Sequence, residues 1–141
     1  MTAIAYRNGV IAGDSRAVTG TGVKYVDRGK VWKARGHLFG ASGNAVPDNG
    51  DMVEWFFSEN RGSMPKCSFS LIVVTPTGAK VLLGSDGGLR KLDDFSFFSV
   101  GAGSEVCFGA MEAGATAAQA VAAAIKWHPQ CGGYVITRRL K

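Results

Sequence analysis

The residue after the initiator methionine, Thr2, has a side chain that can act as a nucleophile. Because threonine is small, we expect methionine aminopeptidase to remove Met1 and to leave Thr2 with a free α-amine. An α-amine titrates near ~7.7 to 8.0, and its neutral form can take the proton of its own threonine hydroxyl, directly or through water. The start of the chain therefore predicts a nucleophile that carries its own base.

Several other catalytic motifs are absent from the sequence. There is no P-loop, no His-Glu-x-x-His and no Gly-x-Ser-x-Gly, and the two histidines, His37 and His128, are far apart. Gly101-Ala102-Gly103 precedes a predicted helix, as phosphate-binding loops do, but it lacks the third glycine of a dinucleotide fingerprint. We interpret it as a tight strand-to-helix turn, and we expect neither a metal site nor an organic cofactor.

Length and composition favour one globular domain that spans residues 1–141. The chain has 141 residues, of which 46% are hydrophobic and 19% are charged, and this excludes a disordered chain. Cys67, Cys107 and Cys131 form no close pair, which excludes a zinc ribbon or a disulfide framework and favours a reducing compartment. No run approaches the ~18 to 20 apolar residues of a membrane span, so we expect a soluble, cytoplasmic protein.

The formal net charge of +5 comes from 16 basic and 11 acidic residues, and the basic residues are scattered along the sequence. The longest basic cluster is Arg138-Arg139. A solvated basic face explains this better than a nucleic-acid site, because no stacking aromatic residues alternate with the basic ones. A nucleic-acid-binding module, the lowest-ranked hypothesis, predicts salt-sensitive binding to DNA or RNA.

Short apolar runs separated by glycine are typical of β-strands, and the first half of the chain has five. They are Ala3–Tyr6, Val10–Ala12, Val23–Val26, Val31–Trp32 and Leu38–Phe39. Two later runs, Phe69–Thr75 and Ala79–Leu83, flank Pro76-Thr77-Gly78 and predict a hairpin. Because Leu71–Val74 is continuously apolar, we expect protein to cover both faces of this sheet.

Three segments have the apolar spacing of α-helices. The first runs from Val46 to about Glu59, with Asn44 or Asp48 as N-cap and an apolar stripe of Met52, Val53, Phe56 and Phe57. The second covers Ser104–Ala113, with Ser104 as N-cap and Gly114 as the stop. The third covers Thr116–Trp127, with a Thr116/Gln119 capping box and a stripe of Ala118, Val121, Ala122 and Ile125.

Pro129 ends the third helix, and Tyr134–Thr137 is the last predicted strand. The order is therefore strands, one helix, strands, two helices and one strand. This is not the regular alternation of a doubly wound parallel sheet. It predicts an α+β fold, with two sheets sandwiched between outer helix layers in an αββα arrangement.

Five short segments together resemble a known family. They are Gly9–Ala17, Lys30-Val31, Gly40–Ala45, Val100–Gly103 and Cys131–Val135. In this order the chain resembles the β-type subunits of the proteasome and the bacterial HslV peptidase, which are N-terminal nucleophile (Ntn) hydrolases. The likeness spans nearly the whole chain. It implies two antiparallel sheets between helix layers, the arrangement inferred above from the element order.

The resemblance implies roles for individual residues. Thr2 would be the nucleophile, Lys30 a buried cation beside it, and Asp14 the carboxylate that orients Lys30, because a buried ammonium needs a partner. The backbone N–H of Gly43 matches the oxyanion donor, and Val18 and Ala45 match positions where the backbone pairs with an extended peptide substrate. Without the resemblance, Asp14 and Gly43 suit turns and Lys30 suits a solvated strand.

The chain departs from the family pattern at three positions. Ala102 replaces a supporting serine, although Ser104 follows two residues later, and His128 and Cys131 stand where proteasomes have aspartate and serine. His128 either replaces the acid as a hydrogen-bond partner or is a surface histidine after a helix, and we favour the second. The chain also has one helix rather than two between its early and middle strands.

The resemblance implies a threonine peptidase that works in a self-compartmentalising homo-oligomeric ring on peptide or protein substrates. No cofactor is implied, and an unfoldase ATPase would be a compatible partner. The alternative is a catalytically inactive ring or scaffold protein, which Ala102 and the short chain favour.

Overall fold

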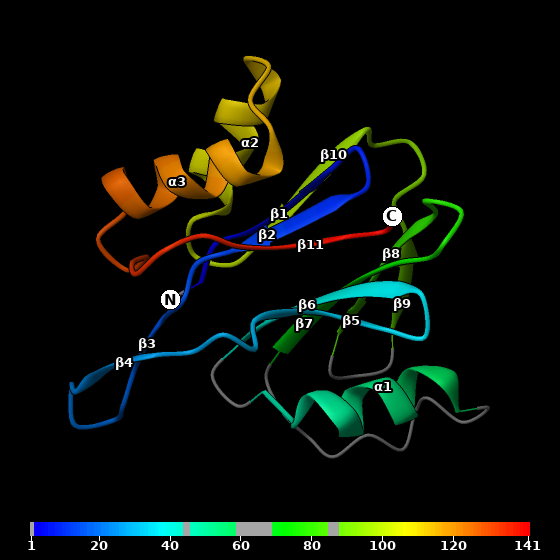
Figure 1. The fold of residues 1–141 in the computed structure, drawn as a ribbon, viewed down its shortest axis with the longest axis horizontal. Coiled ribbons are helices and arrows are strands. Elements are labelled where there is room, and N and C mark those ends of the chain that lie inside the picture. The colour runs from blue at the N-terminus through cyan, green and yellow to red at the C-terminus, as the bar shows by residue number, and fades with distance from the viewer. Residues whose placement is uncertain (1, 44–45, 59–68, 85–87) are drawn as a thin grey trace.

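A computed structural model of the chain describes residues 2–43, 46–58, 69–84 and 88–141. The strands are β1 (Ile4–Arg7), β2 (Val10–Gly13), β3 (Arg16–Val18), β4 (Lys24–Val26), β5 (Val31–Ala34), β6 (His37–Gly43), β7 (Phe69–Val74), β8 (Lys80–Gly84), β9 (Leu89–Lys91), β10 (Phe97–Val100) and β11 (Ile136–Arg139). The helices are α1 (Asn49–Phe57), α2 (Ser104–Glu112) and α3 (Ala117–Trp127). Figure 1 shows this mixture of sheets and helices, which confirms the predicted α+β class.

All strand pairs in the described parts of the chain are antiparallel. One sheet has the order β10-β1-β2-β11, a second has the order β5-β6-β7-β8-β9, and β3 pairs with β4 alone. The predicted hairpin is confirmed as β7-β8. Because β11 pairs with β2 and β10 pairs with β1, late segments of the chain flank its beginning.

Side chains along β1 alternate between two cores, as the two-residue period of a strand requires. Ala3 and Ala5 pack against α2 and α3, where Cys107, Met111 and Val121 complete a core rich in small residues. Ile4 and Tyr6 point the other way and pack against residues of the second sheet. Small residues thus bring the two helices close to one face of β1, while larger residues fill the space between the sheets.

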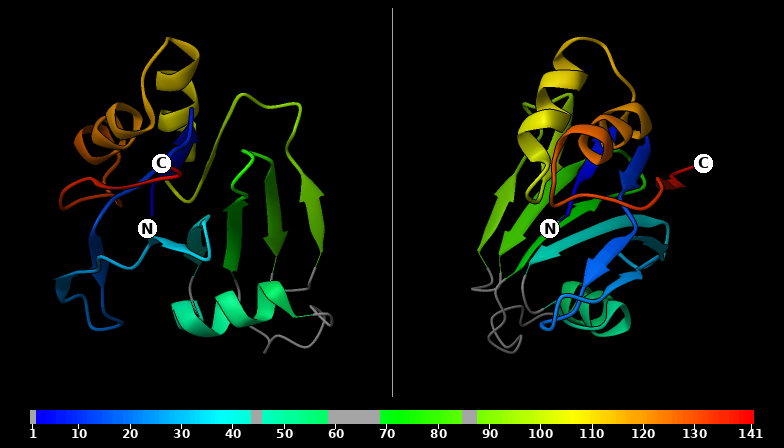
Figure 2. Two further views of the ribbon diagram at one scale, coloured as in Figure 1. Left: turned by 45° about the vertical axis from the view of Figure 1, so that its right-hand side comes forward. Right: turned by 90° about the vertical axis from the view of Figure 1, so that its left-hand side faces the viewer.

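The second sheet is also covered on both faces, as the continuous apolar run of β7 predicts. Ile72 and Val74 face the first sheet, whereas Leu71 and Val73 pack with buried residues of α1. The views in Figures 1 and 2 agree that α2 and α3 lie on the outer side of the first sheet and α1 on the outer side of the second.

The helix boundaries follow the sequence signals with one correction. Asp48 caps α1 through Gly50, and Thr116 and Gln119 form the predicted capping box of α3. Gly114 (φ +103°) ends α2 as predicted. Ser104, however, is the first residue of α2, and Gly103 is its N-cap. The N-cap position has no room for a side chain, because a Cβ on Gly103 would lie 2.8 Å from Cys131 Sγ and 2.9 Å from the Ala3 methyl.

Two predicted apolar stripes differ from the buried faces. The buried residues of α3 are Ala117, Ala120, Val121 and Ala124, whereas Ala122 is exposed. In an alanine-rich helix the sequence does not fix which face is buried, and contacts with β1 and β2 decide it. In α1, Trp55 is buried and Phe57 lies at the exposed edge, because α1 turns the 52–56 face toward the second sheet.

The last strand begins two residues later than the predicted Tyr134. The Tyr134 N–H donates instead to Ser15 Oγ (2.8 Å), and pairing with β2 starts where Ile136 meets Gly13. Three short strands, β3, β9 and β10, were not predicted. Each has three or four residues, too few for a clear two-residue apolar period.

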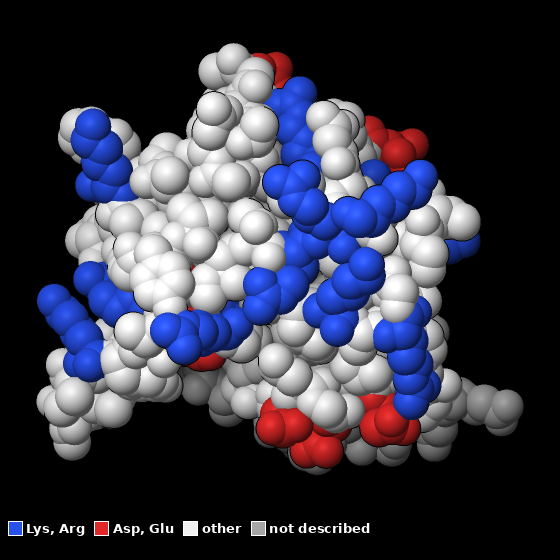
Figure 3. All heavy atoms as spheres, viewed as in Figure 1, with Lys and Arg blue, Asp and Glu red and all other residues white. Residues whose placement is uncertain are grey.

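Basic side chains gather on one face of the molecule. In Figure 3 they form a band across this face, and acidic side chains lie at its lower edge. Arg138 and Arg139 of β11 and Lys33 of β5 are exposed, and the Lys33 ammonium donates to the carbonyl of Leu140 (2.9 Å), so these strand edges are neighbours. This is the solvated basic face that the charge balance predicts. Among the described residues, no helix is long and apolar enough to span a membrane.

Candidate active site

Thr2 is held just before β1 by the turn that leads into α2. Its side chain and backbone are almost covered, with 8% of the residue exposed. The Thr2 carbonyl accepts a hydrogen bond from the Gly103 N–H (3.0 Å). Gly101 has φ +100°, and a Cβ on it would collide with the Thr2 carbonyl oxygen. The strand-to-helix turn predicted at 101–103 is confirmed, and it positions the backbone of Thr2.

Asp14 follows β2 and is buried, with 1% of the residue exposed. Its Oδ1 accepts from the Ala3 N–H (3.0 Å) and from the Lys30 ammonium (3.0 Å). Its Oδ2 accepts from the Gly132 N–H (3.1 Å), and its own N–H donates to the Ala3 carbonyl (3.0 Å). The carboxylate is thus bound to the residue next to Thr2.

Lys30, just before β5, is 8% exposed and places its ammonium between two oxygens. The ammonium donates to Asp14 Oδ1 (3.0 Å) and to the Arg16 carbonyl (2.6 Å). Burial of an ion pair costs desolvation energy that the mutual attraction barely offsets, so such a pair is poor evidence for a stabilising role. The pair is thus buried one residue from Thr2, to which it is linked through the Ala3 N–H.

The other predicted residues lie on three different segments. Gly43 is the exposed last residue of β6 and pairs with Phe69, while the preceding Ser42 places its hydroxyl oxygen 3.2 Å from the Cβ position of Gly101. The end of β6 therefore reaches the turn that holds Thr2. Val18 lies in β3, half-buried, opposite Lys24. Ala45 lies outside the described residues.

His128 and Cys131 occupy different environments. His128 is the C-cap of α3, and its ring Nδ1 accepts from the Gln130 N–H (3.2 Å), which agrees with the interpretation as a histidine after a helix. Cys131 is 3% exposed and packs against Gly103. Burial raises the pKa of the Cys131 thiol and the Asp14 carboxylate raises it further, whereas Lys30 and Arg16 lower it. Cys131 is thus a neutral thiol beside the charged residues.

Sequence reasoning gave no role to the 129–134 segment, although Cys131-Gly132-Gly133 belongs to the resemblance. The Gly132 carbonyl accepts from the N–H groups of Ser15 and Arg16 (3.2 Å each), and the Gly132 N–H binds Asp14. Paired glycines near a chain end signal a backbone that must approach another segment closely. The sequence therefore indicated a close approach of this backbone to another segment, but it did not show that the other segment is 14–16.

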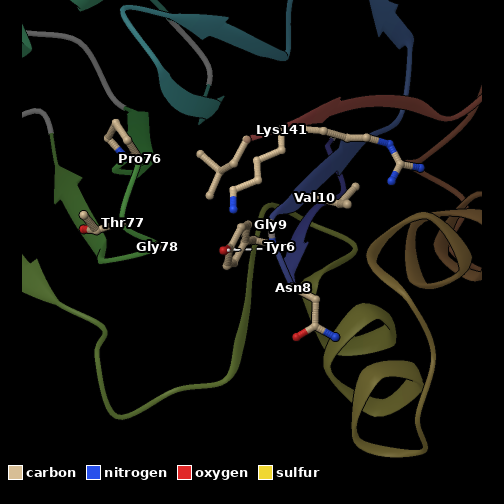
Figure 4. Close-up of a pocket in the computed structure, with 10 residues that line it drawn as sticks. Tyr6, Asn8, Gly9, Val10, Pro76, Thr77, Gly78 and Lys141 are labelled. Atoms are coloured by element: carbon tan, nitrogen blue, oxygen red, sulfur yellow. Dashed lines mark hydrogen bonds between the residues drawn. The ribbon is translucent and has the colours of Figure 1, made fainter.

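A pocket of about 460 Å³ lies at the other end of β1, between the β1-β2 turn and the β7-β8 turn. Figure 4 shows Tyr6, Gly9 and Thr77 around it, with the Lys141 side chain directed toward Tyr6. None of Thr2, Asp14 and Lys30 lines this pocket. Among the described residues, no three His, Cys, Asp or Glu side chains are grouped so as to hold a metal ion.

Three solved structures resemble the whole chain. HslV from Trypanosoma brucei superposes with a TM-score of 0.68 at 12% identity and covers 98% of both chains. BPH from Thiobacillus denitrificans, in complex with epoxomicin, gives 0.63 at 17% identity, covering 99% of this chain and 98% of that one. The Gly-1 mutant of Anbu from Hyphomicrobium sp. strain MC1 superposes with a TM-score of 0.64 at 14% identity, and the match covers 96% of this chain and 79% of the Anbu chain.

This chain has a proteasome-type Ntn hydrolase fold. The resemblance inferred from the sequence is confirmed at the level of the fold. Comparison of the sequence with family models and with curated proteins finds no match. In this Ntn hydrolase fold, Thr2 stands at the start of a central strand and Asp14 at the end of its neighbour, so the β1-β2 pair brings them together.

Proposed function

We propose that this protein is an N-terminal threonine peptidase, in which Thr2 attacks peptide bonds after removal of Met1. The observation that carries the proposal is the buried Asp14–Lys30 pair bound to the Ala3 N–H, one residue from Thr2. The fold shared with HslV supports it. We also propose that residues 1–141 form one Ntn hydrolase domain with an αββα sandwich. The three separate hydrophobic clusters, one for each space between two layers, support this layering.

In the proposed reaction, the neutral α-amine of Thr2 takes the proton of its own hydroxyl while Oγ bonds to the scissile carbonyl carbon. The carbonyl oxygen becomes an oxyanion, which the Gly43 N–H would bind. Collapse of this tetrahedral intermediate breaks the C–N bond of the substrate, and the protonated α-amine of Thr2 gives its proton to the leaving amine. An ester between Thr2 Oγ and the acyl part of the substrate remains. Water then hydrolyses the ester with the same amine as base, which regenerates the hydroxyl.

Lys30 and Asp14 supply the electrostatic part of this mechanism. In the proposed reaction, the Lys30 ammonium would supply positive charge that favours loss of the proton from the Thr2 hydroxyl, and low local polarity would strengthen that effect. Asp14 fixes the ammonium and, through the Ala3 N–H, the backbone that carries Thr2. Both residues act without donating or accepting the transferred proton.

We further propose that peptide substrates pair with the backbone near Val18 and Ala45, and that the chain forms a homo-oligomeric ring in the cytoplasm. Exposed apolar residues support a shared surface near the proposed substrate side: Val23, Tyr25 and Val26 of the β3-β4 hairpin region are each at least half exposed. An unfoldase ATPase as partner belongs to the same proposal and rests on the fold alone.

Intact-mass analysis with a peptide epoxyketone tests the function. Epoxomicin, the ligand named for BPH, captures a threonine hydroxyl together with its own free amine. We expect native protein without Met1 to gain one adduct, the Thr2→Ala variant to gain none, and the control Thr77→Ala, in the β7-β8 turn, to react like the wild type. Retained Met1 and no adduct would favour the inactive ring or scaffold protein instead.

A further inference from the structure

Arg16 binds Lys30 of the buried ion pair directly and Asp14 through Gly132, although sequence reasoning gave it no role. We propose that the Arg16 guanidinium is a positioning residue: it fixes the 129–133 segment, whose Gly132 N–H orients Asp14 toward Lys30. This inference rests on the proposed peptidase function, and it adds a residue that acts through others on that reaction.

The first step links Arg16 to the 129–133 segment. Arg16 Nη2 donates to the Pro129 carbonyl (2.8 Å), and the Arg16 backbone N–H donates to the Gly132 carbonyl (3.2 Å). The guanidinium also covers Gly132, because a Cβ there would lie 2.7 Å from Arg16 Cζ and Nε. Arg16 thus holds both ends of the Pro129–Gly132 segment, and a side chain at position 132 would have to displace the guanidinium.

The second step links this segment to the ion pair. The Gly132 N–H donates to Asp14 Oδ2 (3.1 Å), the oxygen that does not bind Lys30. The Arg16 carbonyl accepts from the Lys30 ammonium (2.6 Å). Movement of Gly132 would therefore rotate the Asp14 carboxylate, and movement of Arg16 would displace Lys30.

Stability alone does not explain this arginine. Within the described residues, Arg16 Nε is buried without a hydrogen-bond partner. An unpaired buried donor destabilises the folded state, and most buried polar groups have a hydrogen-bond partner. The guanidinium keeps this unfavourable position over Gly132, whose N–H binds the Asp14 carboxylate. That combination is typical of a side chain placed for geometry near reacting groups.

Replacement of Arg16 with chemical rescue tests the proposal. We expect Arg16→Ala to lower kcat about 10- to 100-fold with KM unchanged, because misplacement of supporting groups acts on the chemical step. Millimolar methylguanidine should restore at least part of kcat, and methylammonium should not. Arg16→Lys should stay slow, since an ammonium cannot cover Gly132 and reach Pro129 together. Arg28→Ala, which removes an exposed arginine bound to Tyr134, is the matched control and should keep wild-type kcat.

The outcomes separate this inference from the peptidase proposal. If wild-type protein without Met1 gains no epoxomicin adduct, the proposed function fails. If wild-type protein reacts but Arg16→Ala keeps kcat within twofold, or loses it without rescue by methylguanidine while its melting curve is unchanged, the positioning role is wrong. Faster amide hydrogen exchange at Gly132 in Arg16→Ala is expected in addition, and unchanged exchange would also overturn the inference.

Discussion

Asp14→Asn removes one charge from the candidate site and keeps the shape of the side chain. In the wild type, Asp14 accepts from Ala3, Lys30 and Gly132. An asparagine has only one acceptor oxygen, so its NH2 group would face the donor of either Gly132 or Lys30. The Lys30 ammonium, in a residue that is 8% exposed, would keep its bond to the Arg16 carbonyl but lose the negative charge at 3.0 Å.

The expected loss of stability is large for a single isosteric change. Breaking a buried ion pair by removing one partner costs about 3 to 5 kcal/mol, because an uncompensated charge stays buried. Unfolding entropy is about 2.1 cal/mol/K per residue near the melting temperature, or about 0.3 kcal/mol/K for a chain of this length. The melting temperature should therefore fall by about 10 to 17 °C.

A double-mutant cycle measured by urea unfolding isolates the pair. Asp14→Asn and Lys30→Met should each destabilise the protein, and the double variant should recover about 2 to 3 kcal/mol relative to their sum. Asp27→Asn is the matched control, since Asp27 Oδ1 accepts from the Gly29 N–H (2.8 Å) and asparagine can keep that bond. It should cost no more than about 1 kcal/mol.

Additive single effects would refute this reasoning. A coupling energy below about 0.5 kcal/mol would mean that water solvates the two charges and that they do not form a buried pair. In that case the geometry that carries the proposed function would also be wrong. A large coupling energy together with unchanged activity of Lys30→Met would confirm the buried pair but show that its proposed role in catalysis is wrong.

Two further perturbations test the surroundings of the site. Gly101→Ala should lower the free energy of unfolding by more than about 3 kcal/mol and displace Thr2. The control Gly78→Ala, also at positive φ but in open space, should lower it by about 1 kcal/mol. Equal melting temperatures of the two variants would contradict the contact between Gly101 and Thr2. Burial raises the pKa of Cys107 from 9.0 to about 11, so the unfolded thiol ionises first. The contribution of the neutral Cys107 thiol to the free energy of unfolding should be constant below pH 9 and fall by about 3 kcal/mol between pH 9 and 11. Urea unfolding at a series of pH values should show a shallower decline in stability for Cys107→Ala than for the wild type.

The sequence by itself determined the kinds of element and their order. Capping residues such as Asp48 and Thr116, the glycine at 114 and the Pro76–Gly78 turn are local signals, because each acts on backbone groups a few residues away. The continuous apolar run of β7 correctly predicted cover on both faces. The α+β class follows from these local signals.

Only the tertiary structure decided which faces are buried and where the short strands lie. The alanine-rich α3 has apolar residues on every side, so contact with β1 and β2 selects Ala117, Ala120 and Ala124. Likewise, Gly103 replaces Ser104 as N-cap because Cys131 and Ala3 crowd that position. These outcomes depend on atoms more than twenty residues away in the sequence, which no local pattern contains.

The candidate site divides in the same way. Thr2 was a candidate from its place after Met1 and its chemistry, and the resemblance strengthened it. Asp14 and Lys30 were candidates only through the resemblance, because neither has an unusual local pattern. The link from Arg16 through Gly132 to Asp14 joins residues more than a hundred positions apart, and pairing of β11 with β2 creates it. The sequence determined which groups are available, and the sheet determined which of them meet, since hydrogen bonds and ion pairs act only over a few ångströms.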